Sequence, residues 1–111
     1  MVVLSSSPFG SSARSRTLLA LRLMGSSYAR ELARLLGLAL NGVQGSLRSL
    51  ERDGLVIARP VGRTRVFELN PRYFAASALN SYLDKLTAAD RDLQSAVAAL
   101  RRRPRRTGKP G

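Results

Sequence analysis

Two short stretches near the middle of the chain carry apolar residues at the spacing of an α-helix, on one face each. The first ends at residue 36 and the second covers residues 40–53. Their apolar positions are Ala29, Leu32, Ala33 and Leu36, and then Val43, Leu47 and Leu50. Gly37 separates the stretches, and glycine takes the left-handed conformation that ends a helix at no steric cost. The pattern predicts two helices joined by a tight turn.

The residues on either side of this pair predict further elements. A more apolar helix is expected over about residues 15–24, because its four leucines offer more apolar surface than one helix face needs. A Gly-Ser-Ser break follows, in which Ser27 is a candidate N-cap for the next helix. Beyond the pair, residues 55–59 and 65–69 are β-prone around a turn that contains glycine, which predicts a hairpin.

The last third of the chain is predicted to be helical from Asn70-Pro71 to about residue 103. Asparagine is a favourable N-cap, and proline suits the first helical position. Leucines then recur at intervals of seven, at Leu79, Leu86, Leu93 and Leu100. Asp90 interrupts the repeat, and Thr87-Ala-Ala-Asp90 resembles a capping box, so the segment is either one long helix or two.

The apolar seam of this last segment has two candidate uses. It packs onto the first helix of the same chain, or it forms the contact between two copies. The four leucines span about 32 Å at 1.5 Å per residue, which is more than one short helix covers. We therefore expect a homodimer. The expected dimerisation residues are Leu79, Tyr82, Leu83, Leu86, Leu93, Val97 and Leu100.

Composition adds a strong positive charge to this picture. The 111 residues include 19 Lys and Arg against 7 Asp and Glu, which gives a formal net charge of +12. Such a surface attracts polyanions, nucleic acid first and anionic membrane second. Residues 101–111 hold six positive charges and no acidic residue, so half of the excess lies elsewhere. This basic end is a solvated arm, a localisation tag or a source of non-specific phosphate contacts.

The missing residue types exclude several kinds of site. The sequence has no Cys and no His, hence no disulfide, no thiolate and no imidazole ligand for a metal. Without His, the many Ser residues have no imidazole base, and no pair of carboxylates is placed for acid–base work. The apolar runs are far shorter than the ~20 residues of a membrane span. We expect a cytoplasmic protein that is not an enzyme and uses no metal, cofactor or membrane.

The outer side of the second helix of the pair carries amides and arginines rather than acidic residues. An α-helix fits the major groove of DNA, where an amide side chain can form two hydrogen bonds with adenine. Asn41 and Gln44 are candidates for that contact, and Gly45 lets the helix backbone approach closely. Arg48 and Arg52 are candidates for phosphate contacts, with solvated surface arginine as the alternative.

Three arginines cluster around the predicted hairpin turn at Gly62. They are Arg59, Arg63 and Arg65. The simplest explanation is that charges on an edge strand discourage aggregation. The alternative is a basic wing that follows the DNA backbone or enters the minor groove, where narrow A·T tracts attract arginine. Arg63, at the tip, is the strongest candidate, and it would add affinity more than sequence information.

Several short motifs, taken in order, resemble one family. They are Arg30-Glu-Leu-Ala-Arg-Leu-Leu-Gly37, Gly42-Val-Gln44, Leu47-x-x-Leu50-Glu51-x-x-Gly54-Leu-Val56, Gly62-Arg-x-Arg65 and Phe67-x-Leu-Asn70. Over roughly residues 15–75 the chain resembles the winged helix-turn-helix domains of ArsR-like transcriptional regulators. It is also similar to the small winged-helix modules found ahead of nucleotidyltransferase domains. The chain departs from the metal-sensing members, which use Cys and His sites.

The resemblance implies an α-α-α-β-β-α order, a recognition helix at 40–53, a wing at 59–65 and a repressor released by an effector. We therefore expect a mainly α protein with a small β-hairpin and a long C-terminal helical segment. The expected organisation is a flexible N-terminal arm over 1–13, a winged helix-turn-helix domain over 14–70, a dimerisation segment over 71–103 and a basic disordered tail over 104–111.

These expectations favour a sequence-specific regulator that binds double-stranded DNA as a homodimer and is a repressor, with its effector unknown. Two alternatives stay open at the level of sequence. One is a winged-helix module that binds another protein through its leucine-rich helix, or simply a helical hairpin within a bundle. The other is a non-specific nucleoid-type binder of nucleic acid that is driven by charge.

Overall fold

The computed structural model describes residues 12–102, which form five helices and three short strands. In chain order these are α1 (Ser12–Met24), β1 (Ser26–Tyr28), α2 (Ala29–Leu36), α3 (Leu40–Arg52), β2 (Val56–Val61), β3 (Thr64–Leu69), α4 (Ala76–Ala88) and α5 (Arg91–Arg102). The predicted class, mainly α with a β-hairpin, is confirmed. Most of the predicted N-terminal arm and all of the predicted basic tail lie outside the described residues.

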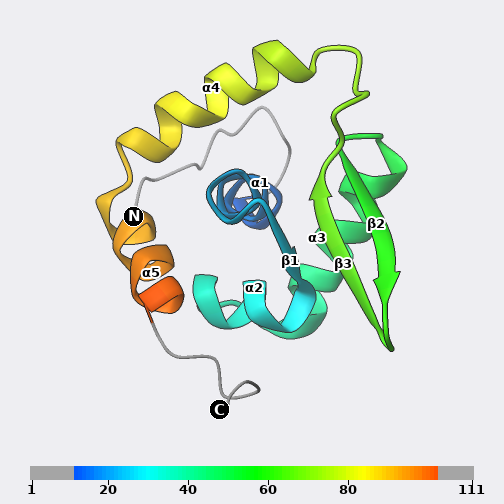
Figure 1. Cartoon of the computed structure of the whole chain (residues 1–111), viewed down its shortest axis with the longest axis horizontal. Helices are drawn as coiled ribbons and strands as arrows, with labels where there is room; N and C mark the ends of the chain where they lie inside the picture. The colour runs from blue at the N-terminus through cyan, green and yellow to red at the C-terminus, as the bar shows by residue number, and fades with distance from the viewer. Residues whose placement is uncertain (1–11, 103–111) are drawn as a thin grey trace.

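Helix α1 runs through the middle of the molecule, and the other elements surround it (Figure 1). It contacts each of the other four helices as well as β1 and β3. Leu18, Leu19 and Leu21 are all fully or almost fully buried, although they point in different directions around the helix. This explains why the segment carries more leucine than one face requires, since a central helix is covered on every side.

The two helices of the predicted pair end where their glycines predict. Gly37 follows α2 with φ 67°, and the next amide, that of Leu38, donates to the carbonyl of Ala33 at 3.0 Å. Gly54 follows α3 with φ 83°, and the amide of Leu55 donates to the carbonyl of Leu50 at 3.0 Å. Both are left-handed helix ends of the kind that glycine allows.

The three strands form one antiparallel sheet in the order β1-β3-β2. A two-residue turn joins β2 to β3, with Gly62 at φ 62° between Val61 and Thr64. Strand β1 was not expected. Ser27, predicted to cap α2, instead pairs with Phe67 of β3, and its hydroxyl donates to the Glu31 carboxylate at 2.6 Å. The prediction that Ser27 caps α2 was wrong, because the residue belongs to a three-residue strand that depends on its distant partner β3.

The chain after the sheet also departs from the prediction. Asn70 does not begin a helix, because its carboxamide oxygen accepts from the amide of Arg72 at 2.9 Å and its nitrogen donates to the carbonyl of Gly54 at 2.9 Å. These bonds hold a turn against the end of α3. Helix α4 therefore begins at Ala76, several residues later than expected.

The C-terminal segment is two helices, the second of the two alternatives. Asp90 lies between them, is only 1% exposed, and its Oδ1 accepts from the amide of Leu93 at 3.0 Å. It is thus the N-cap of α5, whereas Thr87 belongs to α4. The break lets α4 and α5 bend around α1 (Figure 1).

This bend changes the interpretation of the leucine repeat. Leu79, Leu83, Leu93 and Val97 are buried in the core of their own chain, and Leu86 packs against that core. For these residues the intramolecular alternative holds, because both helices turn their apolar sides toward α1. Leu100 is half-buried, and Tyr82 is the one member of the predicted seam that is exposed. The role of these residues in a dimer stays a prediction.

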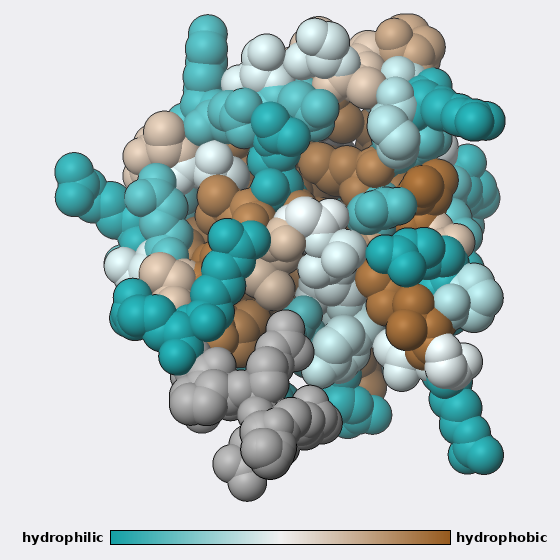
Figure 2. All heavy atoms as spheres, viewed as in Figure 1, coloured by the Kyte–Doolittle hydropathy of each residue, from teal (hydrophilic) through white to brown (hydrophobic). Residues whose placement is uncertain are grey.

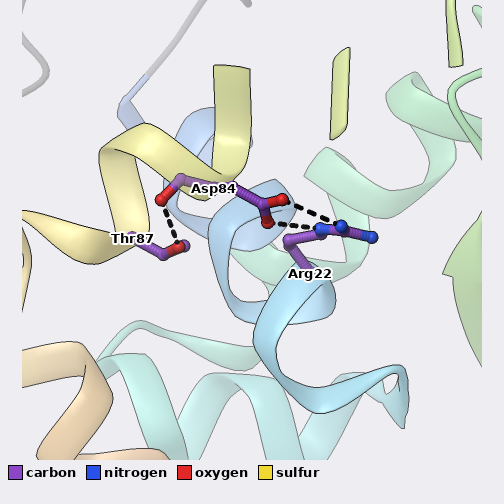
Figure 3. Close-up of polar contacts among 3 residues, drawn as sticks. All are labelled: Arg22, Asp84 and Thr87. Carbon is purple, nitrogen blue, oxygen red and sulfur yellow. Dashed lines mark hydrogen bonds and ion pairs between the residues drawn. The ribbon is translucent and has the colours of Figure 1, made fainter. Parts of the chain in front are cut away.

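Two arginine contacts fix the C-terminal helices to α1. Arg22 of α1 donates from Nε and Nη2 to the Asp84 carboxylate of α4, at 2.7 and 3.0 Å, and the Thr87 hydroxyl donates to the Asp84 carbonyl (Figure 3). Arg101 of α5 donates to the carbonyls of Leu23 and Met24 at the end of α1. Within residues 12–102, no helix is both long and apolar enough to cross a membrane.

Candidate nucleic-acid interface

Helix α3 rests on the core through Val43, Leu47 and Leu50, all of them buried. Arg14 of α1 holds the far end of α3, since it bonds Ser49 and forms a 3.0 Å ion pair with Asp53. At 100° per residue the opposite face of α3 points to solvent. Its exposed side chains are Asn41, Gln44, Arg48 and Arg52, with Gly45 half-buried among them. The expected amide and arginine face thus exists, and its role in DNA binding stays a prediction.

The N-terminal end of α3 adds positive potential to this face. Ala39 occupies the N-cap position and provides no side-chain bond, and no acidic residue lies in the first turn. The first amides of the helix are therefore without a side-chain cap, and they carry the positive end of the helix dipole. Such an end suits an approaching phosphate group.

The hairpin arginines divide into two kinds. Arg59 and Arg63 are exposed and appear in no hydrogen bond or ion pair among the described residues. Arg65 is engaged: its Nη2 lies 2.9 Å from the Glu51 carboxylate of α3, and its guanidinium lies 5.3 Å from the centre of the Phe67 ring. Arg65 therefore ties the hairpin to α3, a contact that the sequence did not predict.

An open groove of about 470 Å³ lies between the start of α2, the exposed side of α3 and the hairpin. Its lining residues are Tyr28, Ala29, Arg30, Leu40, Gln44, Leu47, Arg48, Arg63, Thr64, Arg65 and Phe67. Four of these are arginines and none is acidic. Arg65 is paired with Glu51, so Arg30, Arg48 and Arg63 supply the unbalanced positive charge. Like charges held around one hollow raise the local concentration of an anion, so the groove suits a phosphodiester backbone. We call it the basic groove.

The basic groove brings together only part of the predicted site. Gln44, Arg48, Arg63 and Arg65 line it, whereas Asn41, Gly45, Arg52 and Arg59 do not. Sequence reasoning missed Tyr28 and Arg30. Tyr28 belongs to β1 and pairs with Val66, which sets it and the neighbouring start of α2 beside the hairpin. No local signal marks these two residues, because their position depends on the pairing of β1 with β3.

Solved structures of other proteins share this arrangement. A MarR variant from E. coli matches with a TM-score of 0.60 at 21% identity, over 84% of this chain and 68% of that one. A ZitR variant from Lactococcus lactis, in complex with DNA, matches with a TM-score of 0.57 at 15% identity, over 81% and 63%. YusO from Bacillus subtilis matches with a TM-score of 0.55 at 15% identity, over 81% and 57%. The chain has the winged-helix fold.

The likeness is one of fold, because identities near 20% or below do not carry function. All three neighbours are longer than this chain, which spans 57% of YusO and 63% of ZitR. The sequence matches no protein-family model and no curated protein. In the winged-helix fold, α2 and α3 occupy the positions of the helix-turn-helix, and the β2–β3 hairpin occupies the position of the wing.

Proposed function

We propose that this winged-helix chain is a sequence-specific regulator of transcription that binds double-stranded DNA as a homodimer and catalyses no reaction. The observation that carries the proposal is the basic groove, where Arg30 of α2, Arg48 of α3 and Arg63 of the wing line one hollow and no lining residue is acidic. The fold neighbours support it: MarR carries the name of a repressor in one solved structure, and ZitR is found with DNA.

Each side chain has a distinct proposed role. Gln44 and Asn41 bond base edges in the major groove, because amides present the donor and acceptor pair that adenine requires. Arg30, Arg48 and Arg63 hold the phosphates on either side, and Arg52 and Arg59 extend those contacts. Arg65 acts through Glu51, by holding the wing at a fixed angle to α3.

The sign of regulation and its release by an effector are inferred from the family resemblance. We infer a cytoplasmic repressor that occludes a promoter and leaves it when an effector binds, and the motifs quoted above favour the ArsR-like group. The effector is unassigned. The lack of Cys and His in the full sequence argues against a metal sensor of the thiolate or imidazole type.

The test is selection of bound sequences from a random DNA pool with the whole protein, followed by binding measurements on two variants. Gln44→Ala should change the preferred bases, at about 1–3 kcal/mol for a lost two-bond contact. Arg63→Ala should weaken binding to all sequences alike. Arg91→Ala, an exposed arginine on α5, is the matched control and should change neither.

The outcomes separate the proposal from its two alternatives. An enriched inverted repeat supports a dimeric regulator. A pool that shows no enrichment, together with equal affinity for all sequences, indicates a non-specific binder driven by charge. Absence of DNA binding, or weak binding that neither Gln44→Ala nor Arg63→Ala changes, would favour a protein-interaction module instead.

A further inference from the structure

A pocket of about 200 Å³ opens between α2 and α5. Its apolar wall consists of Leu35 of α2 and of Ala96, Ala99 and Leu100 of α5. Ala96 and Ala99 are neighbours on one side of α5, and their small side chains leave space against α2 that larger residues would fill. Figure 2 shows hydrophobic residues at this junction, where α5 and α2 lie side by side in Figure 1. We call it the α2–α5 pocket.

Two side chains of opposite charge form the polar side of the α2–α5 pocket. Glu31 and Arg34 both line it, and because they are three residues apart on α2, their Cβ atoms lie about 5–6 Å from each other. The Oε1 atom of Glu31 accepts from the buried Ser27 hydroxyl at 2.6 Å, which orients the carboxylate and leaves its other oxygen available. Arg34 is exposed and forms no hydrogen bond or ion pair within residues 12–102.

This pair of charges selects the class of ligand. A simple cation is repelled by Arg34 and by the net charge of +12 on the chain, and a simple anion meets the Glu31 carboxylate. A free α-amino acid carries an ammonium group and a carboxylate on the same carbon atom. It can therefore pair with Glu31 and Arg34 at once, through charge-assisted hydrogen bonds. The apolar wall beside them suits an aliphatic side chain on that same carbon.

The volume of the α2–α5 pocket limits the size of this ligand. Pockets for drug-sized molecules measure roughly 300–1,000 Å³, so a pocket of about 200 Å³ suits something smaller, such as one amino acid. A peptide suits it less well, because each peptide bond neutralises one ammonium group and one carboxylate. The ligand that matches both the size and the charges is a single aliphatic amino acid about as large as leucine.

We propose that the α2–α5 pocket binds a free aliphatic α-amino acid, and that this ligand is the effector of the regulator proposed above. The regulatory part rests on the proposed function, whereas the binding part does not. Tyr28 connects the two sites, because it lines both the α2–α5 pocket and the basic groove. It also occupies the N-cap position of α2, so a ligand packed against it acts on the start of the helix that carries Arg30. Ligand and DNA then favour different positions of the same residue.

The first experiment is titration calorimetry of the whole protein with L-leucine, in the absence of DNA. We expect a dissociation constant on the order of 100 μM, because a small ligand in an open pocket makes few contacts. Glycine lacks the aliphatic chain, 4-methylpentanoate lacks the ammonium group and 3-methylbutylamine lacks the carboxylate. Each should bind about tenfold more weakly than L-leucine, or weaker still. No binding of L-leucine at about 10 mM, or equally tight binding of any of these probes, overturns the proposal.

A second experiment places the ligand in the α2–α5 pocket. Arg34→Gln and Glu31→Gln each remove one charge and should each weaken the binding of L-leucine by about tenfold or more. Ala99→Leu fills the pocket and should abolish binding, while its thermal unfolding stays close to that of the wild type because position 99 is exposed. Arg91→Gln, an exposed arginine of α5 outside the pocket, is the matched control and should not change the affinity. Binding that survives Ala99→Leu, or that Arg91→Gln weakens as much as Arg34→Gln does, overturns the assignment.

This inference and the proposed function fail separately. Saturating L-leucine should weaken the binding of selected DNA by about fivefold or more in the wild type and not in Ala99→Leu, and saturating DNA should weaken L-leucine binding by the same factor. A protein that binds L-leucine in this pocket but binds no DNA removes the proposed function and leaves the ligand site intact. A protein that binds DNA but no L-leucine overturns this inference and keeps the function. Binding of both without mutual effect overturns the role of the ligand as effector.

Discussion

At the scale of single residues, Arg22 and Asp84 show how one ion pair joins helices that are far apart in sequence. The guanidinium donates two hydrogen bonds to the carboxylate across the α1–α4 contact (Figure 3). These bonds lower the pKa of the Asp84 carboxyl below its usual 3.8, because they stabilise the charged form. They raise the pKa of Arg22 for the same reason.

The pair predicts a specific dependence of stability on pH. A carboxyl whose pKa is depressed by folding stabilises the native state above its unfolded pKa, and that contribution is lost as the pH falls through the folded pKa. Asp84→Asn should therefore unfold at lower urea concentration than the wild type at pH 7. The difference should shrink below about pH 4. Arg22→Gln, alone and combined with Asp84→Asn, is the control: the double variant should lose little more than either single one.

Gly45 allows stability and binding to be separated at one residue. A Cβ built on Gly45 comes no closer than 3.9 Å to its nearest neighbour, the Arg48 guanidinium, and one built on Gly42 meets nothing within 4 Å. Alanine at either position should stabilise α3 by about 0.5–1 kcal/mol, because glycine lowers helix stability. Gly45 lies in the middle of the outer face and Gly42 at its side, so only Gly45→Ala should weaken DNA binding. Urea unfolding and a binding titration measure the two effects.

If Gly45→Ala binds DNA as well as the wild type does, the backbone of α3 does not approach the bases at that point. Gly42→Ala controls for the gain in helix stability itself. A loss of binding in both variants would indicate that α3 needs its glycines for adjustment on DNA rather than for space.

At the scale of elements, Asp90 decides the path of the C-terminal third of the chain. Its carboxylate caps α5 at the amide of Leu93, and the break that it marks brings Leu83 and Leu93 to the same core. Without this cap, the buried amide of Leu93 in the first turn of α5 has no hydrogen-bond partner. The capping residue, rather than the leucine repeat, therefore determines that there are two helices.

Asp90→Ala should destabilise the protein by about 1 kcal/mol, within the range for the loss of an N-cap. Asp90→Ser retains a side-chain oxygen and should recover most of the loss. Far-UV circular dichroism during urea unfolding measures both. An alanine variant as stable as the wild type would indicate that α5 needs no cap, and that packing of Leu93 and Val97 alone holds it in place.

The elements differ in how far local sequence determines them. The extents of α2, α3 and the hairpin were predictable, because helical periodicity and the glycines at 37, 54 and 62 act within a few residues. Strand β1 was not, because it exists through its pairing with β3, forty residues away. The leucine repeat predicted an apolar seam correctly but not what covers it, since the same spacing serves a core and an interface.

The candidate site divides in the same way. The exposed face of α3 follows from its apolar periodicity, so Asn41, Gln44 and Arg48 were predictable as solvent-facing side chains. The engagement of Arg65 with Glu51, and the place of Tyr28 beside the wing, were not. Both depend on how the sheet meets the helices, which a single sequence does not encode in any local pattern.

At the scale of the whole molecule, positive charge is divided between residues 12–102 and the run of residues 103–111. Residues 103–111 carry four positive charges, at Arg103, Arg105, Arg106 and Lys109, and no acidic residue. Ending the chain after Arg102 should weaken binding to specific and random DNA by a similar factor. The slope of log affinity against log salt should fall by up to about 3.6, at roughly 0.9 per lost phosphate contact. Titrations at several salt concentrations measure this.

The preferred sequence should not change in the shortened protein, because the proposed base contacts come from α3. A shortened protein with altered preference would assign a reading role to the terminal arginines. One with an unchanged salt slope would show that these residues make no phosphate contact at all.

The central position of α1 also affects when its apolar surface is buried during synthesis of the chain. Leu18, Leu19 and Leu21 belong to the first described helix, whereas Leu93 and Val97, which help to enclose it, belong to the last one. A growing chain on the ribosome therefore carries an apolar helix that stays partly uncovered until α5 has been synthesised. Arg101, which donates to the last carbonyls of α1, completes that enclosure only after α5 has been synthesised.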